Sequence, residues 1–356
     1  MKKTVRAFAL VAVGAVVGAG ALTACSSGSG GASATGGSDT KIGLLLPESQ
    51  TTRYEAFDRP LFEQKVAELS DYQVVYANAD QDADRQQQQA EAQLADGVSV
   101  IVLDPVDAKS AVSIVSAANA QGVPVVSYDR LIAGGELAYY VSFDNEKVGE
   151  LQGQALVDEL AATGASGGIL MVNGSPTDSN AAQFKAGAHT VIDASGIPVV
   201  AEYDTPDWLP DKAQEWVAGQ LNQGGGIAGV YAANDGTAGG AIAALKAANI
   251  TPWPVVTGQD AELAAIQRII AGDQFMTVYK AITQEAERAA EVAVQLAGGE
   301  KVTGDTEVDG TPATLLTPVV VTADNVMDTV VADGFHTVDE ICTAAYAQAC
   351  AAAGIG

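Results

Sequence analysis

The sequence predicts an α/β protein made of two lobes, each a doubly wound parallel sheet with helices on both faces. From Lys41 onward, short apolar runs alternate with amphipathic stretches, which is typical of βαβ units. The candidate strands outnumber those of one typical sheet, which favours two sheets. The 356 residues are also enough for two domains that each bury a core of their own.

The first 24 residues are typical of a secretory signal. Lys2 and Arg6 lie in a basic start, and an apolar run of small residues follows from Phe8 to Gly20. That run is short for a stable membrane span. We therefore expect residues 1–24 to be a signal peptide that directs the chain out of the cytoplasm.

The signal ends in Leu22-Thr23-Ala24-Cys25, which resembles the bacterial lipobox, in which the cysteine is acylated and becomes the mature amino terminus. The alternative is an ordinary signal peptide with a chance cysteine. Residues 25–39 are rich in Gly, Ser, Ala and Thr and have no apolar periodicity, so they are predicted to be a flexible tether. The prediction is an extracytoplasmic protein anchored to the cell membrane by lipidated Cys25.

The body of the chain follows as strands and helices in alternation. Helices are expected at Glu146 to Leu160, around Leu263, Ile266 and Ile270, and from Gln284 to Leu296, where apolar residues recur at helical spacing. The candidate strands are Ile42–Leu46, Gln73–Ala77, Val98–Leu103, Val123–Tyr128, Tyr139–Phe143, Gly168–Val172, Val199–Tyr203, Gly229–Ala232, Val255–Gly258, Met276–Tyr279 and Leu316–Val321.

Polar residues follow most of these strands, at the point where each strand ends. In a parallel sheet these ends open on one edge, so their side chains converge on one crevice per lobe. Capping of the next helix is the alternative role for any single Asp or Asn, and we expect Asp144 and Asp235 to be caps or hinge residues. The polar ends are Asp104, Asp129-Arg130, Asp144-Asn145, Asn173, Asn234-Asp235, Gln259-Asp260 and Lys280.

The composition excludes several classes of partner. Hydrophobic residues make up 48% of the chain and charged residues 17%, which indicates a globular protein. A formal net charge of −26 argues against nucleic acid, which binds clustered Lys and Arg. A repressor is further excluded because no basic helix-turn-helix is present and the chain carries an export signal. The acidic balance suits a small ligand that is not strongly anionic.

No cofactor or metal is expected. The run from Gly224 to Gly229 fits G-x-G-x-x-G but precedes a strand, and no P-loop motif occurs. Asp80, Asp82, Asp84 and Glu91 have the spacing of an EF-hand loop. Arg85 occupies the sixth position, where the sharp turn of that loop requires Gly, so these acids are predicted to decorate the start of a helix.

An enzyme is also disfavoured. The only two histidines, His189 and His336, are not near a Ser or Cys nucleophile signature. Asp129 and Asp260 could serve a glycosidase, which is the alternative of another class. Neighbouring Arg130 and Lys280 would keep such acids ionised, whereas a general acid needs a raised pKa.

The polar strand ends suit an uncharged polyhydroxylated ligand. A sugar hydroxyl both donates and accepts hydrogen bonds, so its site mixes acceptors such as Asp129 and Asp260 with donors such as Arg130 and Lys280. The C–H face of a pyranose packs on a flat ring, and Trp208 is the expected platform, with an ordinary core Trp as the alternative. Tyr54, in the loop between the first strand and helix, is the second candidate platform.

Several stretches closely resemble the D-xylose-binding proteins of bacterial ABC importers, in the same order, from about Lys41 to about His336. They are Tyr128-Asp129-Arg130, Ser142 to Gln152, Gly174-Ser175-Pro176-Thr177-Asp178-Ser179-Asn180-Ala181, Trp208-Leu209-Pro210, Asn234 to Ile242, Gly258-Gln259-Asp260-Ala261-Glu262-Leu263 and Met276-Thr277-Val278-Tyr279-Lys280.

This resemblance implies a type I periplasmic binding protein, in which two Rossmann-like lobes joined by three crossovers close on one sugar. The implied lobes are residues 40–144 with 281–316, and residues 145–280 with 317–341, followed by a tail at 342–356. The implied sugar ligands are Arg53, Asp129 and Arg130 in the first lobe, Asp178, Asn180, Trp208, Asn234 and Asp260 in the second, and Lys280 at the second crossover.

The implied partners are a monosaccharide, most specifically D-xylose, and an ABC permease with its cytoplasmic ATPase. The receptor itself is implied to be a monomer. Tyr54 departs from the family at a position often held by Trp, and residues 55–60 differ in length. A receptor for glucose, galactose, arabinose or several sugars, or a chemosensory sugar sensor, therefore stays an alternative.

Cys342 and Cys350 lie outside this resemblance, in the C-terminal tail. An exported chain reaches an oxidising compartment, so we expect these two cysteines to pair with each other. The alternative is two free thiols on a terminal helix, because a separation of eight residues needs a turn before the sulfurs meet.

Overall fold

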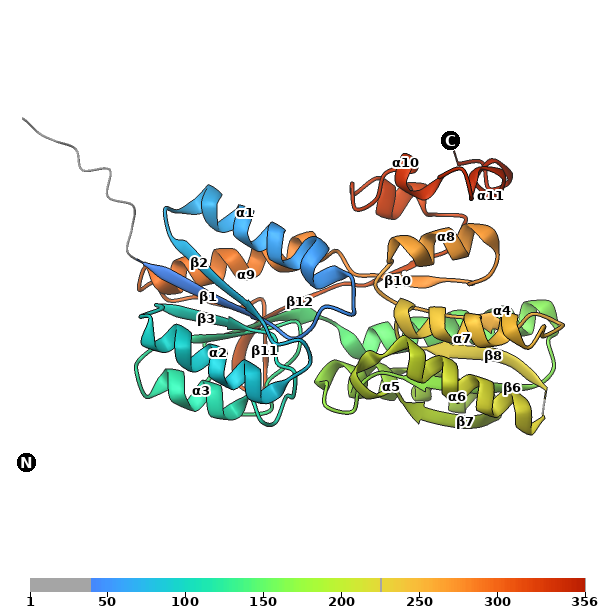
Figure 1. Cartoon of the computed structure of the whole chain (residues 1–356), viewed down its shortest axis with the longest axis horizontal. Helices are drawn as coiled ribbons and strands as arrows, with labels where there is room; N and C mark the ends of the chain where they lie inside the picture. Colours follow the sequence, from blue (N-terminus) through green and yellow to red (C-terminus); the bar gives the residue numbers. More distant parts are fainter. Residues whose placement is uncertain (1–39, 225, 356) are drawn as a thin grey trace, which may run out of the picture. The chain divides into compact units, whose positions relative to one another are not determined.

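The computed structural model describes residues 40–224 and 226–355 (Figure 1). The predicted signal peptide, the predicted lipidation site Cys25 and the predicted tether lie outside these described residues. Within them, no helix has both the length and the apolar character that crossing a membrane requires.

The first lobe is built on a seven-stranded sheet in the order β11-β12-β5-β4-β3-β1-β2, parallel except for β11. Inner strands such as β3 and β4 are buried along their whole length, as expected when helices cover both faces. Helices α1 and α9 cover one face and α2 and α3 the other (Figure 1). The strands are β1 (Lys41–Leu46), β2 (Gln73–Asn78), β3 (Val100–Leu103), β4 (Val125–Tyr128), β5 (Tyr139–Phe143), β11 (Thr306–Val308) and β12 (Thr311–Leu316), and the helices are η1 (Tyr54–Asp58), α1 (Arg59–Leu69), α2 (Ala83–Ala95), α3 (Val112–Asn119) and α9 (Ile282–Ala297).

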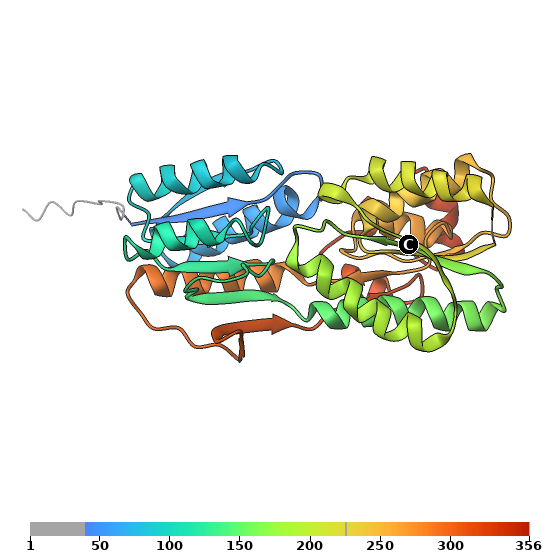
Figure 2. The same cartoon turned by 90° about the horizontal axis from the view of Figure 1, so that it is seen from below.

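The second lobe has a parallel four-stranded sheet in the order β7-β6-β8-β9 and a separate antiparallel pair, β10-β13. Figure 2 shows α4 and α5, in green, on one face of the sheet and α6 and α7, in yellow, on the other. The strands are β6 (Gly168–Asn173), β7 (Val199–Asp204), β8 (Ile227–Ala232), β9 (Val255–Val256), β10 (Thr277–Tyr279) and β13 (Val319–Val321), and the helices are α4 (Asn145–Thr163), α5 (Ser179–Ser195), η2 (Pro206–Trp208), α6 (Pro210–Gln223), α7 (Asp235–Ala247) and α8 (Leu263–Ala271).

The chain passes between the two sheets three times: after β5 at Asp144, after β10 at Lys280, and between β12 and β13 at Thr317-Pro318. Asp144 caps α4 by accepting a hydrogen bond from the Lys147 backbone N at 3.0 Å, which confirms its predicted capping role. The predicted α/β class with parallel sheets is confirmed.

Helices α4 and α5 pack in close contact because glycines lie on their facing sides. A Cβ on Gly149 would overlap the Phe184 carbonyl, and a Cβ on Gly187 would overlap the Glu146 carbonyl. The absent side chains let the two backbones approach each other. This packing fixes the start of α5, which carries Asp178 and Asn180 at the carboxyl end of β6.

The predicted strand Leu316–Val321 is confirmed at Leu316 and at Val319–Val321 but is wrong as one continuous strand. Leu316 ends β12, and β13 begins at Val319 after a break at Thr317-Pro318, because proline has no N–H for a sheet ladder. The preceding hairpin β11-β12 was not predicted. Its two-residue turn, Asp309-Gly310, has φ values of 49° and 81°, and Asp-Gly is a strong signal for such a turn.

The C-terminal segment packs against α8 of the second lobe. It contains η3 (Met327–Val331), α10 (Val338–Ile341) and α11 (Ala347–Ala352). Cys342 and Cys350 form a disulfide, with their Cα atoms 5.9 Å apart. The Gln267 Nε2 of α8 donates to the Glu340 carbonyl O at 3.1 Å, which adds a second attachment of this segment to the second lobe.

Candidate functional site

One buried cavity gathers every sugar-ligand residue that the sequence predicted. Each of these residues is at most 5% exposed, and they come from the carboxyl ends of strands in both lobes. Thr51, Phe184 and Gln259 also line the cavity and were not among the predicted ligands. The predicted residues that line it are Arg53, Tyr54, Asp129, Arg130, Asp178, Asn180, Trp208, Asn234, Asp260 and Lys280.

The cavity has a volume of about 20 Å³, so the lining side chains of the two lobes contact each other directly. Asn180 Nδ2 donates to the Asp129 carbonyl O at 3.1 Å, and the Ala108 backbone N donates to the Thr177 carbonyl O, also at 3.1 Å. A space of this size holds about one water molecule. A larger ligand must therefore move these side chains, or the lobes themselves, apart.

Asp129 is the central acceptor of the site. It follows β4 with φ +54°, a left-handed conformation that is uncommon for a residue other than glycine. Its carbonyl O accepts from Ser142 Oγ at 2.6 Å as well as from Asn180. Its carboxylate accepts from Arg53 Nη1 and from Tyr54 Oη, each at 3.2 Å. These bonds hold the strained backbone so that the carboxylate faces the cavity.

The Asp129 carboxylate is ionised at neutral pH. Burial alone would raise its pKa, but the charges of Arg53, Lys280 and Arg130 outweigh burial and lower the pKa to about 2. Asp129 therefore offers oxygen atoms that only accept hydrogen bonds, as a sugar hydroxyl that donates requires.

Arg130 connects the two lobes. Its Nη2 donates to Tyr54 Oη at 3.0 Å, and its Nε lies 3.0 Å from Asp178 Oδ2. Asp178 caps α5 of the second lobe by accepting from the Asn180 backbone N at 2.8 Å, and its Oδ2 accepts from Trp208 Nε1 at 3.0 Å. The Tyr54 hydroxyl contacts both Asp129 and Arg130, so this side chain acts through its hydroxyl. Tyr54 begins the helical stretch η1, which corrects its predicted place in a loop.

Lys280, at the second crossover, supplies the third cation. Its Nζ lies 3.3 Å from Asp260 Oδ1 and 3.8 Å from Asp129 Oδ1. The same Nζ lies 5.4 Å and 5.7 Å from the ring centroids of Phe143 and Phe184, within cation–π distance. One ammonium group therefore contacts acids of both lobes at the point where the chain crosses between them.

The strand end at Asn234-Asp235 corrects one prediction. Asn234 is the helix cap, because its Oδ1 accepts from the Thr237 backbone N at 2.8 Å. Asp235 is neither a cap nor a hinge residue. Its buried carboxylate accepts from the Glu262 backbone N, from Gln274 Nε2 and from Thr277 Oγ1 at 2.8–2.9 Å. Asp235 thus supports the turn that carries Asp260, and burial raises its pKa well above the usual range.

The Trp208 indole forms one apolar wall of the cavity. Its ring meets Phe184 edge-on, with the ring centroids 6.4 Å apart. Its far edge lies against Gly174, where a Cβ would overlap the indole ring. Trp208 is thus part of the core of the second lobe and also lines the cavity, and its role as a platform for a sugar stays a prediction.

We expect Gly174→Ala to weaken sugar binding about tenfold while the protein remains folded. The added methyl group displaces the indole from its position, and overpacking of this kind costs about 1–3 kcal/mol. Isothermal titration calorimetry with D-xylose measures the change. Gly196→Ala is unsuitable as a control because Gly196 has φ +75°, whereas Gly219→Ala is suitable because nothing lies near its Cβ position. Equal affinities for Gly174→Ala and the wild type would contradict this position of the indole.

A second layer of acids surrounds Arg53. Its guanidinium is 2.6 Å from Asp58 Oδ1 and 2.6 Å from Glu285 Oε2. Asp58 lies five residues later in η1, and Glu285 lies in α9, which is remote in sequence. Burial raises the pKa of Glu285 to about 8, against the opposing charge of Arg53. Burial likewise raises the pKa of Asp104, whose Oδ1 is 3.5 Å from Arg130 Nε, well above its usual range.

These raised pKa values predict a protein that becomes more stable as the pH falls from about 8, the pKa of Glu285, towards about 5. A carboxyl group whose pKa is higher in the folded than in the unfolded chain binds more protons in the folded state over this range. Urea unfolding at several pH values measures the effect. Glu285→Gln should flatten the profile, and Glu287→Gln, on the same helix with a side chain that is 43% exposed, is the matched control. A wild-type stability that rises with pH between 5 and 8 would contradict the burial of these acids.

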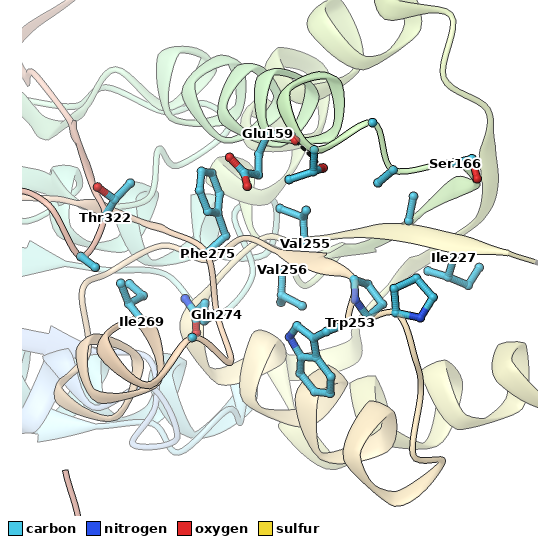
Figure 3. A pocket seen from close by; sticks show the side chains of 18 of the residues that line it. Glu159, Ser166, Ile227, Trp253, Val255, Val256, Ile269, Gln274, Phe275 and Thr322 are labelled. Carbon is cyan, nitrogen blue, oxygen red and sulfur yellow. Dashed lines mark hydrogen bonds between the residues drawn. The ribbon is translucent and has the colours of Figure 1, made fainter. Parts of the chain in front are cut away.

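A larger cavity of about 660 Å³ lies within the second lobe and shares no lining residue with the site above. Figure 3 shows Phe275 and Glu159 on one wall and Trp253 on another, with Val255 and Val256 between them. Its charged lining residues, Glu159 and Asp324, are both acids. Neutral donors such as Ser166 and Thr322 line it, but it has no basic side chain, whereas Arg53, Arg130 and Lys280 line the site above.

The chain is similar to known binding proteins over most of its length. Residues 42–301 match the family described as periplasmic binding protein domain. The D-xylose-binding periplasmic protein of Escherichia coli is 39% identical over 312 residues, covering 85% of this chain and 93% of that protein. The D-xylose-binding periplasmic protein of Haemophilus influenzae is 40% identical over 312 residues, covering 85% of this chain and 92% of that protein.

Solved structures agree with this similarity. An ABC transporter solute binding protein from Clostridium phytofermentans with bound β-D-glucose superposes with a TM-score of 0.77 at 27% identity, covering 85% of this chain and all of that one. The resemblance drawn from the strand-end motifs is thereby confirmed, and the two parallel-sheet lobes have the type I arrangement. This chain belongs to the periplasmic binding protein family.

Proposed function

We propose that this protein is an extracytoplasmic receptor that binds one monosaccharide, D-xylose, between its lobes and delivers it to an ABC permease. The observation that carries the proposal is the convergence of Asp129 and Arg130 from the first lobe with Asp178, Asn180 and Trp208 from the second on one buried cavity. Membership of this family makes the chain a binding protein rather than a sugar-acting enzyme.

The chemistry of the lining suits a neutral sugar. Its acceptors are the carboxylates of Asp129 and Asp260, its donors are Arg130 and Lys280, and Trp208 offers an apolar ring. The buried cations are already paired with acids of the protein, so a strongly anionic ligand would have to compete with Asp129, Asp178 and Asp260. An uncharged ligand avoids that competition.

D-xylose is favoured over a hexose on two grounds. Two relatives at 39% and 40% identity are named for D-xylose binding. The cavity is small and tightly lined, so a pentose, which lacks the hydroxymethyl group of a hexose, requires less displacement of the walls. Glucose remains the rival ligand, because the solved structure from Clostridium phytofermentans contains β-D-glucose.

The delivery role and the anchoring extend the same proposal. We infer that Cys25 carries the lipid, that residues 25–39 tether the lobes to the membrane, and that the receptor is a monomer. The partners would be a permease and its ATPase on other chains. Mass spectrometry of the protein purified from its native membrane tests the anchor: a diacylated Cys25 peptide is expected, and an unmodified Cys25 peptide, or a mature chain that begins at another residue, would refute it.

A calorimetric panel tests the ligand. D-xylose, L-arabinose, D-glucose, D-galactose and myo-inositol are titrated into the protein, and D-xylose should give one saturable site with the lowest dissociation constant. If D-glucose has a lower dissociation constant than D-xylose, the ligand is a hexose and not a pentose, and the proposed receptor function still holds. Absence of binding by every sugar, or release of product from an aryl glycoside, would refute the proposed function.

A further inference from the structure

An aromatic contact joins the first lobe to the C-terminal segment. Phe57, in η1 directly after the β1 loop, stacks on Phe335 with ring centroids 4.2 Å apart and ring planes inclined by 23°. The rings of Tyr279 and His336 lie against Phe335, with centroids 5.2 Å and 4.7 Å away. Such ring pairs stabilise an interface beyond the apolar area that they bury. We call the Phe57–Phe335 pair the aromatic contact.

The two partners of the aromatic contact belong to different lobes. Phe57 lies in η1, which is followed directly by α1, whose Phe62 and Val66 are in the core of the first lobe. Phe335 belongs to a cluster with Ile266 and Ile270 of α8, in the second lobe. The disulfide lies in the same cluster, because Cys350 is buried there. When the lobes move relative to each other, Phe57 and Phe335 therefore move with different bodies.

The C-terminal segment also touches the ligand-binding turn. His336 Nε2 lies 2.8 Å from the carbonyl O of Ala261, the residue after Asp260. Asp260 and Ala261 have φ values of +100° and +52°, so this turn needs outside support. A cavity of about 180 Å³ beside the aromatic contact is lined by Phe57 and Phe335 and also by Arg53 and Asp260, which line the sugar cavity.

We propose that the aromatic contact is a latch between the lobes, which holds them together over bound sugar and slows its release. The proposal rests on the proposed function, because it assigns a role in ligand retention to residues that do not line the sugar cavity. A contact made only while the lobes are together favours that arrangement by its own free energy. Losing it should therefore act on the dissociation rate, while the association rate stays nearly the same.

Phe57→Ala tests the latch with little risk to folding, because Phe57 is only half-buried. Stopped-flow fluorescence should show D-xylose leaving the variant about five times faster than the wild type, with an unchanged association rate. Phe275→Ala is the matched control: Phe275 is also half-buried, but it lines the large cavity of the second lobe and not the aromatic contact. In a double variant with Phe335→Ala, Phe57→Ala should add little further acceleration, because its partner is already gone.

An unchanged dissociation rate in Phe57→Ala, or an equal acceleration in Phe275→Ala, would overturn the latch. Small-angle scattering of the ligand-free protein separates this failure from failure of the proposed function. If the wild type binds no sugar, the proposed function fails, and the latch is then judged by the radius of gyration alone. A larger radius for Phe57→Ala than for the wild type and Phe275→Ala supports the latch, and equal radii refute it.

Discussion

Asp129→Asn is expected to weaken D-xylose binding by about 100-fold, since a charged acceptor contributes about 1.5–3 kcal/mol to a hydrogen bond. Asparagine matches aspartate in size and tolerates the left-handed conformation at φ +54°. The substitution removes the negative charge that faces Arg53 Nη1 at 3.2 Å and Lys280 Nζ at 3.8 Å. Isothermal titration calorimetry at neutral pH, where Asp129 is ionised, measures the loss.

The same variant should remain folded, with a free energy of unfolding lowered by about 2 kcal/mol. Asp58 still neutralises Arg53 and Asp260 still neutralises Lys280, so no buried cation is left without an acid. Asp144→Asn is the matched control, because Asp144 also follows a strand but is exposed and caps α4. Wild-type affinity in Asp129→Asn would remove Asp129 from the binding site.

Trp208→Ala should also weaken D-xylose binding by about 100-fold, because large aromatic side chains are the dominant contacts in buried sites. Unlike an exposed platform, Trp208 also packs against Phe184 and Gly174 in the core of the second lobe. Its truncation should therefore lower the free energy of unfolding by about 3 kcal/mol as well. Calorimetry gives the affinity, and urea unfolding gives the stability.

Two further variants separate binding from stability. Trp208→Phe retains an apolar ring in the core but loses the Nε1 hydrogen bond to Asp178, so it should recover most of the stability and part of the affinity. Trp216→Ala removes an indole from the same lobe that stacks on Tyr203, with centroids 5.3 Å apart, and does not line the cavity. If Trp216→Ala weakened binding as much as Trp208→Ala, the indole of Trp208 would not be a specific contact.

The sequence was informative about the site because residues that follow different strands of a parallel sheet lie close together in the fold. Asp129-Arg130, Asn234 and Asp260 each follow a short buried run, and a parallel sheet brings such positions to one edge. Phe184 was within reach of the same reasoning, since it lies one helical turn after Asn180 on α5 and shares its face. The sequence pattern therefore predicted most of the cavity lining.

The second layer around Arg53 could not be predicted in this way. Glu285 lies in α9, more than two hundred residues after Arg53, and reaches it only because α9 packs beside α1 on the first sheet. Phe57 and Phe335 are in contact only because of the path that the C-terminal segment takes. No pattern at the ends of the strands predicted that path. Contacts between helices or with the C-terminal segment depend on tertiary packing, so the local periodicity of the sequence does not predict them.

A crystal structure of the protein grown with D-xylose would test the central claim most directly. The account predicts one pentose between the lobes, with hydroxyl oxygens within hydrogen-bond distance of the Asp129 carboxylate and with its C–H face on the Trp208 ring. Density for the sugar in the cavity lined by Trp253 and Phe275, with Asp129 and Arg130 still in direct contact with Asn180 and Asp178, would contradict it.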